Sequence, residues 1–226
     1  MLESSKLWVF AKYGSFGNLC TNMFRQIPSK PVNSMTQPLP SVKEEMQPSR
    51  QNLREILIQR RKDAPLALRQ EWDRQICQQL RQLPQIMDTA IIGVYSPIRC
   101  EPNLRDFYQE LQASGKRLAL PVVLAKDSAL AFFEWAPGDV MEKDAFGVLI
   151  PARREREVQA STLLIPCVGY NAARYRLGYG GGFYDRTLAK LPHAHSIGVA
   201  YRLAQCEFAA ANFDLPMSQL ITELSD

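Results

Sequence analysis

The segment 176–186, R-L-G-Y-G-G-G-F-Y-D-R, combines residue types that suit the binding of a phosphate group. Its four glycines lose extra backbone entropy on ordering, so they disfavour helix and strand interiors and favour a tight turn close to a ligand. Arg176 and Arg186 flank the glycines with forked cations, and Asp185 follows directly behind them. A glycine-rich turn that opens a helix is typical of a phosphate-binding loop. A structural turn without a ligand is the alternative.

Two well-known glycine motifs do not match this segment. A Walker A loop ends in Gly-Lys-Ser/Thr, which does not follow Gly182. In a dinucleotide-binding fingerprint, the third glycine would occupy the position of Phe183, and the motif would directly follow its strand. Residues 171–177 intervene here. We therefore expect a phosphate loop of another lineage.

The composition of the 226-residue chain argues against several classes of site. The only two histidines, His193 and His195, lie close together, which excludes a histidine-rich metal site and disfavours a Ser-His-Asp triad. The five cysteines are scattered without a C-x-x-C pair, as expected for free thiols in a reducing compartment. The net charge of +4 is too small to indicate nucleic-acid binding, and no segment has the length and hydropathy of a membrane span. We expect a cytoplasmic protein.

The chain changes character near residue 49. Residues 1–48 are rich in Ser, Asn, Gln and Pro and show no persistent apolar period, so we expect a disordered tail or an upstream start. Residues 49–226 are predicted to form a single α/β domain. The first helix is predicted from Arg50 onward, with an apolar face and a basic flank that includes Arg60 and Arg61.

Helices and strands are predicted to alternate along the rest of the domain. Further helices are expected over residues 65–83, 104–114 and 183–191, and strands over residues 90–95, 117–123, 130–135, 161–170 and 196–201, with a short last strand at 220–223. Nearly continuous apolar strands that alternate with helices indicate a three-layer, mostly parallel sheet with helices on both faces. Ligands bind beyond the carboxyl ends of such strands, so we expect residues 96–101, residues 135–138 and the glycine-rich loop to meet there.

Several motifs together resemble one known family. The segment 176–186 is the most specific, and it is supported by Y-S-P-I-R-C-E-P-N at 95–103, G-K-R-L-A-L-P at 115–121, F-E-W at 133–135, L-R at 53–54 and the terminal D-L-P and I-T-E. On these motifs, residues 50–223 resemble the 5-formyltetrahydrofolate cyclo-ligases, also called 5,10-methenyltetrahydrofolate synthetases. The resemblance implies an enzyme that uses ATP and Mg²⁺ to convert 5-formyltetrahydrofolate to 5,10-methenyltetrahydrofolate, with release of ADP and phosphate. Its partners would be reduced folate and ATP, and it would be a monomer or small homo-oligomer.

The resemblance also implies roles for particular residues on the nucleotide side. Arg176 and Asp185 are the candidate catalytic residues: Arg176 would hold phosphate oxygens, and Asp185 would hold Mg²⁺ or its water. The alternative for Asp185 is a favourable interaction with the positive end of the following helix. Arg50 stands where the family has a lysine, and Arg54 matches the family's arginine. The full set expected to contact ATP is Arg50, Arg54, Arg176, Gly178, Gly180, Gly181, Gly182, Phe183, Tyr184, Asp185 and Arg186.

On the folate side, the expected contacts are Tyr95, Glu101 and Trp135. Glu101 would accept hydrogen bonds from the amino-ketone edge of the pterin, and Trp135 would offer an aromatic face. The alternative for Glu101 is an acid at a helix N-terminus, and for Trp135 it is ordinary core packing.

The chain departs from the family pattern at two places. Asn171 and Arg174 stand where the family has an aspartate and then a glycine before R-L-G, and Ile150 replaces a glutamate. Because of these departures, two other functions stay open: a non-catalytic nucleotide- or folate-binding protein, and another small-molecule phosphotransferase.

Overall fold

A six-stranded sheet with the order β10–β9–β6–β1–β2–β3 forms the centre of the computed structural model, which describes residues 48–224. Its strands are β1 (Ile91–Gly93), β2 (Arg117–Val122), β3 (Ala131–Trp135), β6 (Thr162–Pro166), β9 (His195–Val199) and β10 (Gln219–Ile221). Neighbouring strands are parallel except for β2 and β3, which are antiparallel. The prediction of a mostly parallel sheet is therefore confirmed.

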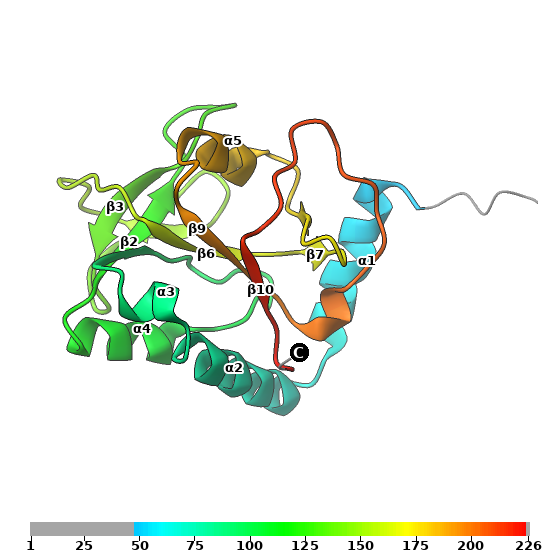
Figure 1. Ribbon diagram of the computed structural model, residues 1–226, viewed down its shortest axis with the longest axis horizontal. Helices are drawn as coiled ribbons and strands as arrows, with labels where there is room; N and C mark the ends of the chain where they lie inside the picture. The colour runs from blue at the N-terminus through cyan, green and yellow to red at the C-terminus, as the bar shows by residue number, and fades with distance from the viewer. Residues whose placement is uncertain (1–47, 225–226) are drawn as a thin grey trace, which may run out of the picture. The chain divides into compact units, whose positions relative to one another are not determined.

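Helices cover both faces of this sheet, as Figure 1 shows. The helices α2 (Leu66–Leu80), α3 (Pro84–Met87) and α4 (Arg105–Ala113) pack on one face, and α5 (Phe183–Lys190) packs on the other. Side chains of a strand alternate between faces, so Leu164 of β6 joins the first core and Leu163 and Ile165 join the second. The central residues of these strands are apolar because helices cover both faces of the sheet, and the predicted three-layer architecture is confirmed.

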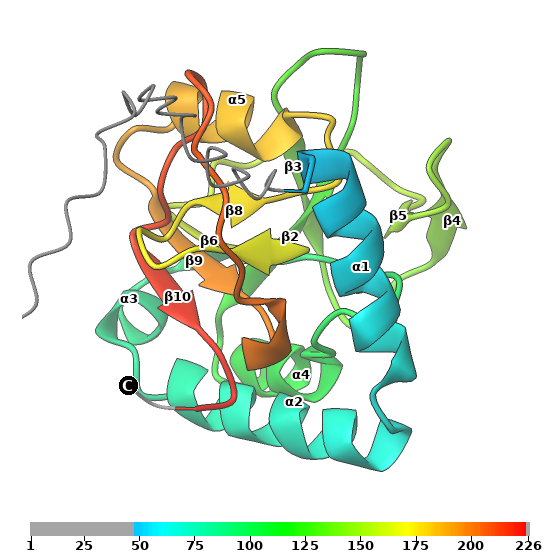
Figure 2. The ribbon, with the colours of Figure 1, turned by 90° about the vertical axis from the view of Figure 1, so that its right-hand side faces the viewer.

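The predicted strand 161–170 is divided in two. β6 ends at Pro166, and after two residues β7 (Gly169–Tyr170) pairs with β8 (Arg176–Leu177) in an antiparallel hairpin. The helix α1 (Arg50–Asp63) lies beside this hairpin (Figure 2). The two are joined by a cluster of Leu57, Val168, Leu177 and Phe208. Gly169 permits this close approach, because a Cβ there would lie 2.6 Å from the Leu57 side chain. The hairpin thus places the glycine-rich loop directly after β8.

A second small hairpin was not predicted. It consists of β4 (Met141–Lys143) and β5 (Leu149–Pro151), and a short 3₁₀ helix covers Arg202–Ala204. None of the helices within residues 48–224 is long and apolar enough to span a membrane. The expectation of a tail over residues 1–48 falls almost entirely outside the described residues and stays a prediction.

Candidate functional site

A cavity of about 480 Å³ lies beyond the carboxyl ends of β1, β2 and β6. Its walls come from residues 95–101 after β1, the end of β2, the hairpin between β4 and β5, one side of α1, and residues 176–185. The cavity thus brings together the glycine-rich loop and the segment 96–101, as the sequence predicts for the carboxyl edge of a parallel sheet.

The expectation that residues 135–138 join this site is wrong. Because β3 runs antiparallel to β2, Trp135 pairs with Leu118 near the amino end of β2, whereas Ala131 pairs with Val122 near its carboxyl end. The Trp135 ring packs edge-on against Tyr108 of α4, with 6.2 Å between ring centroids, and it does not line the cavity. Trp135 therefore packs against the core, the alternative that the sequence left open, and the folate contact expected for it is not supported.

The glycine-rich loop has backbone geometry that other residues would strain. Gly180 and Gly182 have φ values of +100° and +66°, in the left-handed region that disfavours side chains. A Cβ on Gly178 would lie 2.9 Å from Nη1 of Arg176, and one on Gly181 would lie 2.7 Å from the ring of Phe183. Gly182 then caps α5, which begins at Phe183 as predicted. The first turn of a helix presents free N–H groups, which suit an anion in the adjoining cavity.

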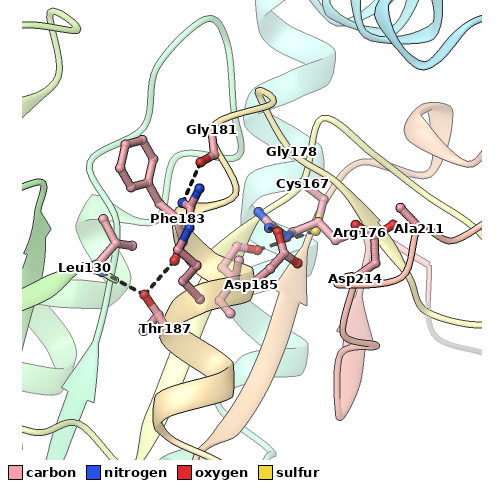
Figure 3. Close-up of polar contacts among 12 residues, drawn as sticks. Leu130, Cys167, Arg176, Gly178, Gly181, Phe183, Asp185, Thr187, Ala211 and Asp214 are labelled. Carbon is pink, nitrogen blue, oxygen red and sulfur yellow. Dashed lines mark hydrogen bonds and ion pairs between the residues drawn. The ribbon is translucent and has the colours of Figure 1, made fainter. Parts of the chain in front are cut away.

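Arg176 and Asp185 face each other across the inner side of the loop (Figure 3). Nη2 of Arg176 donates to Oδ2 of Asp185 over 3.1 Å, and the guanidinium lies 5.1 Å from the centroid of the Tyr184 ring. Arg176 is only 7% exposed, and within residues 48–224 its Nε has no hydrogen-bond partner. Arg176 lines the cavity, so its guanidinium would favour an anionic ligand there.

Arg186 occupies the outer side of the same loop. Its Nη1 donates to the Gly181 carbonyl over 2.8 Å, its Nη2 donates to Asp127 over 3.0 Å, and its guanidinium lies over the Phe183 ring. It does not line the cavity. Arg186 thus supports the loop from behind, while the other residues expected to contact ATP line the cavity.

Arg50 and Arg54 of α1 both line the cavity. Nε of Arg54 donates to the Gly178 carbonyl over 2.8 Å, and burial lowers the pKa of Arg54. Arg50 forms an ion pair with Asp214 and donates to the Ala209 carbonyl over 3.2 Å. Asp214 belongs to the D-L-P motif and lines the cavity, but it was not predicted as a site residue.

In the segment expected to contact folate, Glu101 is buried at 3% exposure, and burial raises its pKa. Its Oε2 accepts from the Ile98 backbone N–H over 2.9 Å, and its Oε1 accepts from the Tyr179 hydroxyl over 2.7 Å. Tyr95 is also buried and donates through its hydroxyl to the Pro102 carbonyl over 2.7 Å. Both residues line the cavity, in agreement with the prediction for this segment.

The prediction from the sequence did not assign two further residues, Arg61 and Phe146, to this region. Arg61 was predicted on the basic flank of the first helix, but it is 2% exposed and donates to the carbonyls of Arg99 and Cys167 and to the Tyr179 hydroxyl. Phe146 is 66% exposed at the tip of the β4–β5 hairpin and lines the cavity, with its ring 6.0 Å from that of Phe183. An exposed aromatic residue within a short polar turn is the one sequence signal that points to Phe146.

The cavity can accommodate a metal only with help from a ligand. Across residues 48–224, no cluster of three or more His, Cys, Asp or Glu side chains could hold an ion. Mg²⁺, however, is commonly bound through one or two carboxylates together with substrate phosphates. Asp185 lines the cavity beside the first turn of α5, so the residues present fit Mg²⁺ that arrives with a polyphosphate.

The comparisons with known proteins agree on one family. The model of the 5-formyltetrahydrofolate cyclo-ligase family matches residues 46–223. The 5-formyltetrahydrofolate cyclo-ligase of Mycoplasma pneumoniae is 31% identical over 134 residues, which cover 58% of this chain and 72% of that protein. The Escherichia coli K12 protein of the same name is 25% identical over 176 residues, 74% of this chain and 96% of its own length.

A solved structure agrees as well. The structure of the 5,10-methenyltetrahydrofolate synthetase of Aquifex aeolicus superposes with a TM-score of 0.68 at 25% identity, covering 78% of this chain and 90% of that one.

Proposed function

Because this chain belongs to the 5-formyltetrahydrofolate cyclo-ligase family, we propose that it converts 5-formyltetrahydrofolate to 5,10-methenyltetrahydrofolate at the expense of ATP. The observation that carries the proposal is the match of the family model over residues 46–223, which contain every wall of the cavity. The glycine-rich loop and Glu101 lie on that one cavity, so a nucleotide and a folate can meet there.

The reaction requires phosphoryl transfer followed by ring closure. The formyl oxygen attacks the γ-phosphorus and ADP leaves. The N5-formyl group is thereby converted to an imidate phosphate. N10 then attacks the former formyl carbon and loses its proton, and phosphate departs with the former formyl oxygen. Phosphoryl transfer depends mainly on positioning and charge neutralisation rather than on covalent help from the protein. The cavity residues are therefore expected to orient the two substrates and to stabilise negative charge.

The inner side of the loop would bind the phosphates. Arg176 offers a buried guanidinium with an unpartnered Nε, and Arg54 lies beside Gly180. Charge-assisted hydrogen bonds of this kind are about twice as strong as neutral ones. Asp185 would hold Mg²⁺, which when bound neutralises charge on the phosphates. Asp185 also fixes Arg176 through their ion pair, so one carboxylate would orient the cation that faces the phosphates.

The opposite wall would bind the folate. Glu101 keeps lone pairs free after accepting from Ile98 and Tyr179, so its carboxylate can accept from the amino-ketone edge of a pterin. Phe146 at the rim offers an exposed ring that would cover an aromatic ligand. Water excluded from this space would otherwise hydrolyse the activated intermediate.

The departures from the family pattern lie away from the cavity. Asn171 donates to the Phe208 carbonyl over 3.1 Å and accepts from the Tyr175 backbone N–H over 3.0 Å, so it shapes the turn between β7 and β8. Ile150 packs in an apolar cluster with Val122, Ala131 and Phe133. Neither residue lines the cavity, which favours the enzyme over a non-catalytic binding protein.

Turnover is tested by mixing the protein with 5-formyltetrahydrofolate, ATP and Mg²⁺ and following the absorbance of the methenyl product. We expect product only when both substrates are present, and the matched control omits ATP. Binding of both ligands without product would support the non-catalytic alternative. ATP hydrolysis that proceeds without folate turnover would support another phosphotransferase.

A further inference from the structure

The side chain of Tyr179, in the middle of the glycine-rich loop, is held at three points by other segments. Its hydroxyl donates to Oε1 of Glu101 over 2.7 Å and accepts from Nη2 of Arg61 over 3.0 Å. The Arg99 guanidinium lies 5.3 Å from the centroid of its ring. These partners come from α1 and from the segment 96–101 on the opposite wall of the cavity. One side chain therefore ties the phosphate-binding loop to the expected folate wall.

The hydroxyl bridges two buried opposite charges. Arg61 and Glu101 are both nearly inaccessible, and within residues 48–224 no carboxylate lies within ion-pair distance of Arg61. Arg61 instead donates to two backbone carbonyls and to the Tyr179 hydroxyl. Buried charges are tolerated only when hydrogen bonds satisfy them, and the Tyr179 hydroxyl provides one hydrogen bond to each of these two ions.

The segment that carries Glu101 depends on the same group of contacts. Arg99 and Cys100 have φ values of +47° and +62°, two consecutive non-glycine residues in the left-handed region. Such a backbone persists only where its surroundings hold it in place. Nε of Arg61 donates to the Arg99 carbonyl over 3.0 Å, and the Arg99 side chain lies against Tyr179. A shift of the loop at Tyr179 would therefore also move the segment that carries Glu101.

We propose that Tyr179 is a positioning residue that couples the two substrate sites, so that a nucleotide on the glycine-rich loop strengthens folate binding at Glu101. The inference rests on the proposed function and adds to it a reason for cooperation between the substrates. A nucleotide bound to the loop would hold the Tyr179 hydroxyl more firmly in this arrangement, and with it the carboxylate that accepts from the folate. Coupling of this kind is reciprocal, so folate strengthens nucleotide binding by the same factor.

The test measures binding of 5-formyltetrahydrofolate by calorimetry, with and without a non-hydrolysable ATP analogue. In the parent protein the analogue is expected to tighten folate binding by about 5- to 150-fold, the usual range for coupled sites. Tyr179→Phe keeps the ring and its contact with Arg99 but removes the hydroxyl. Both ligands should still bind, but the ratio of the folate Kd without the analogue to the Kd with it should fall toward one. Tyr175→Phe is the matched control, because Tyr175 packs against the cluster that joins α1 to the β7–β8 hairpin and does not line the cavity.

The outcomes separate this inference from the proposed function. Loss of coupling in Tyr179→Phe with the parent ratio kept in Tyr175→Phe supports the inference. A parent that binds both ligands independently, or a Tyr179→Phe protein that keeps the parent ratio, overturns it while leaving the function in place. A parent that binds neither ligand contradicts the function itself. A purely structural role for Tyr179 would lower the melting temperature without changing the ratio, and that result also overturns the inference.

Discussion

The two sides of the glycine-rich loop carry similar ion pairs in different surroundings. On the inner side, Arg176 and Asp185 lie 3.1 Å apart, and their side chains are 6% and 17% exposed. On the outer side, Arg186 and Asp127 lie 3.0 Å apart, and their side chains are 36% and 67% exposed. Water screens the outer pair, and exposed pairs of this kind contribute little. The inner pair faces the cavity, where the dielectric constant is lower than in water, so its interaction with a charged ligand is stronger.

The helix explains why the two arginines differ. Successive residues of an α-helix project about 100° apart around its axis, because one turn takes about 3.6 residues. Asp185 and Arg186 are neighbours in the first turn of α5, so a helix that turns Asp185 toward the cavity turns Arg186 away from it. The motif places one arginine on each side of the glycines in sequence, but of these two only Arg176 lines the cavity.

The largest effect is expected from Asp185→Asn, which keeps the shape of the side chain and removes its charge. Turnover should fall on the order of 10²–10³-fold, as for the loss of other electrostatic groups at a reacting centre. Half-saturation should also move to higher Mg²⁺, because the carboxylate proposed to hold the ion is lost. A magnesium titration of the variant that overlays that of the parent would show that Asp185 serves only the helix end.

Arg176→Lys is expected to come next. Lysine keeps the charge but loses the forked geometry, and a hydrogen bond to a charged group is worth about 1.5–3 kcal/mol. That energy corresponds to about a 10- to 150-fold loss in kcat/KM for ATP, with folate binding nearly unchanged. Steady-state kinetics with each substrate varied in turn measure the difference. Unchanged ATP kinetics would assign Arg176 to structure alone.

Arg186→Lys provides the matched comparison on the outer side of the loop. The exposed pair with Asp127 is worth at most about 1 kcal/mol, so kcat/KM for ATP should fall by no more than about fivefold. The same assay applies to both lysine variants. A loss as large as that of Arg176→Lys would remove the distinction between the two sides.

The smallest effect is expected from Trp135→Phe, at the opposite edge of the sheet from the cavity. The buried indole N–H of Trp135 has no hydrogen-bond partner among the described residues, so phenylalanine removes an unsatisfied donor as well as some packing volume. The melting temperature should change little, with a free-energy difference under about 1.5 kcal/mol, and the KM for folate should stay the same. A raised KM for folate would restore the substrate contact expected from the sequence.

Much of the fold follows from local patterns in the sequence. The apolar runs of β6 and β9 predict buried parallel strands, and the glycines followed by Phe183 predict the start of α5. The direction of β3 also follows from the chain, although the prediction overlooked it. Only eight residues separate β2 from β3, too few for a crossover helix, so an antiparallel pair is required. Recognising this would have placed Trp135 away from the site.

Other features depend on tertiary contacts that no local pattern encodes. The break after Pro166 and the pairing of β7 with β8 depend on packing against α1. Arg61 belongs to a helix with basic residues at its end, and its burial arises only because two carbonyls and Tyr179 surround it. The sequence identifies the glycine-rich loop and Glu101, whereas the hydrogen bond that joins them requires the folded chain.

The proposed cyclo-ligase mechanism predicts where the formyl oxygen of the substrate goes. If the formyl oxygen attacks the γ-phosphorus, that oxygen must leave with the phosphate when the ring closes. The measurement supplies 5-formyltetrahydrofolate labelled with oxygen-18 in the formyl group, together with ATP and Mg²⁺, and determines the isotope content of the released phosphate by mass spectrometry. We predict one labelled oxygen per phosphate and one phosphate per methenyl product. Release of unlabelled phosphate would contradict phosphoryl transfer to the folate in this cavity.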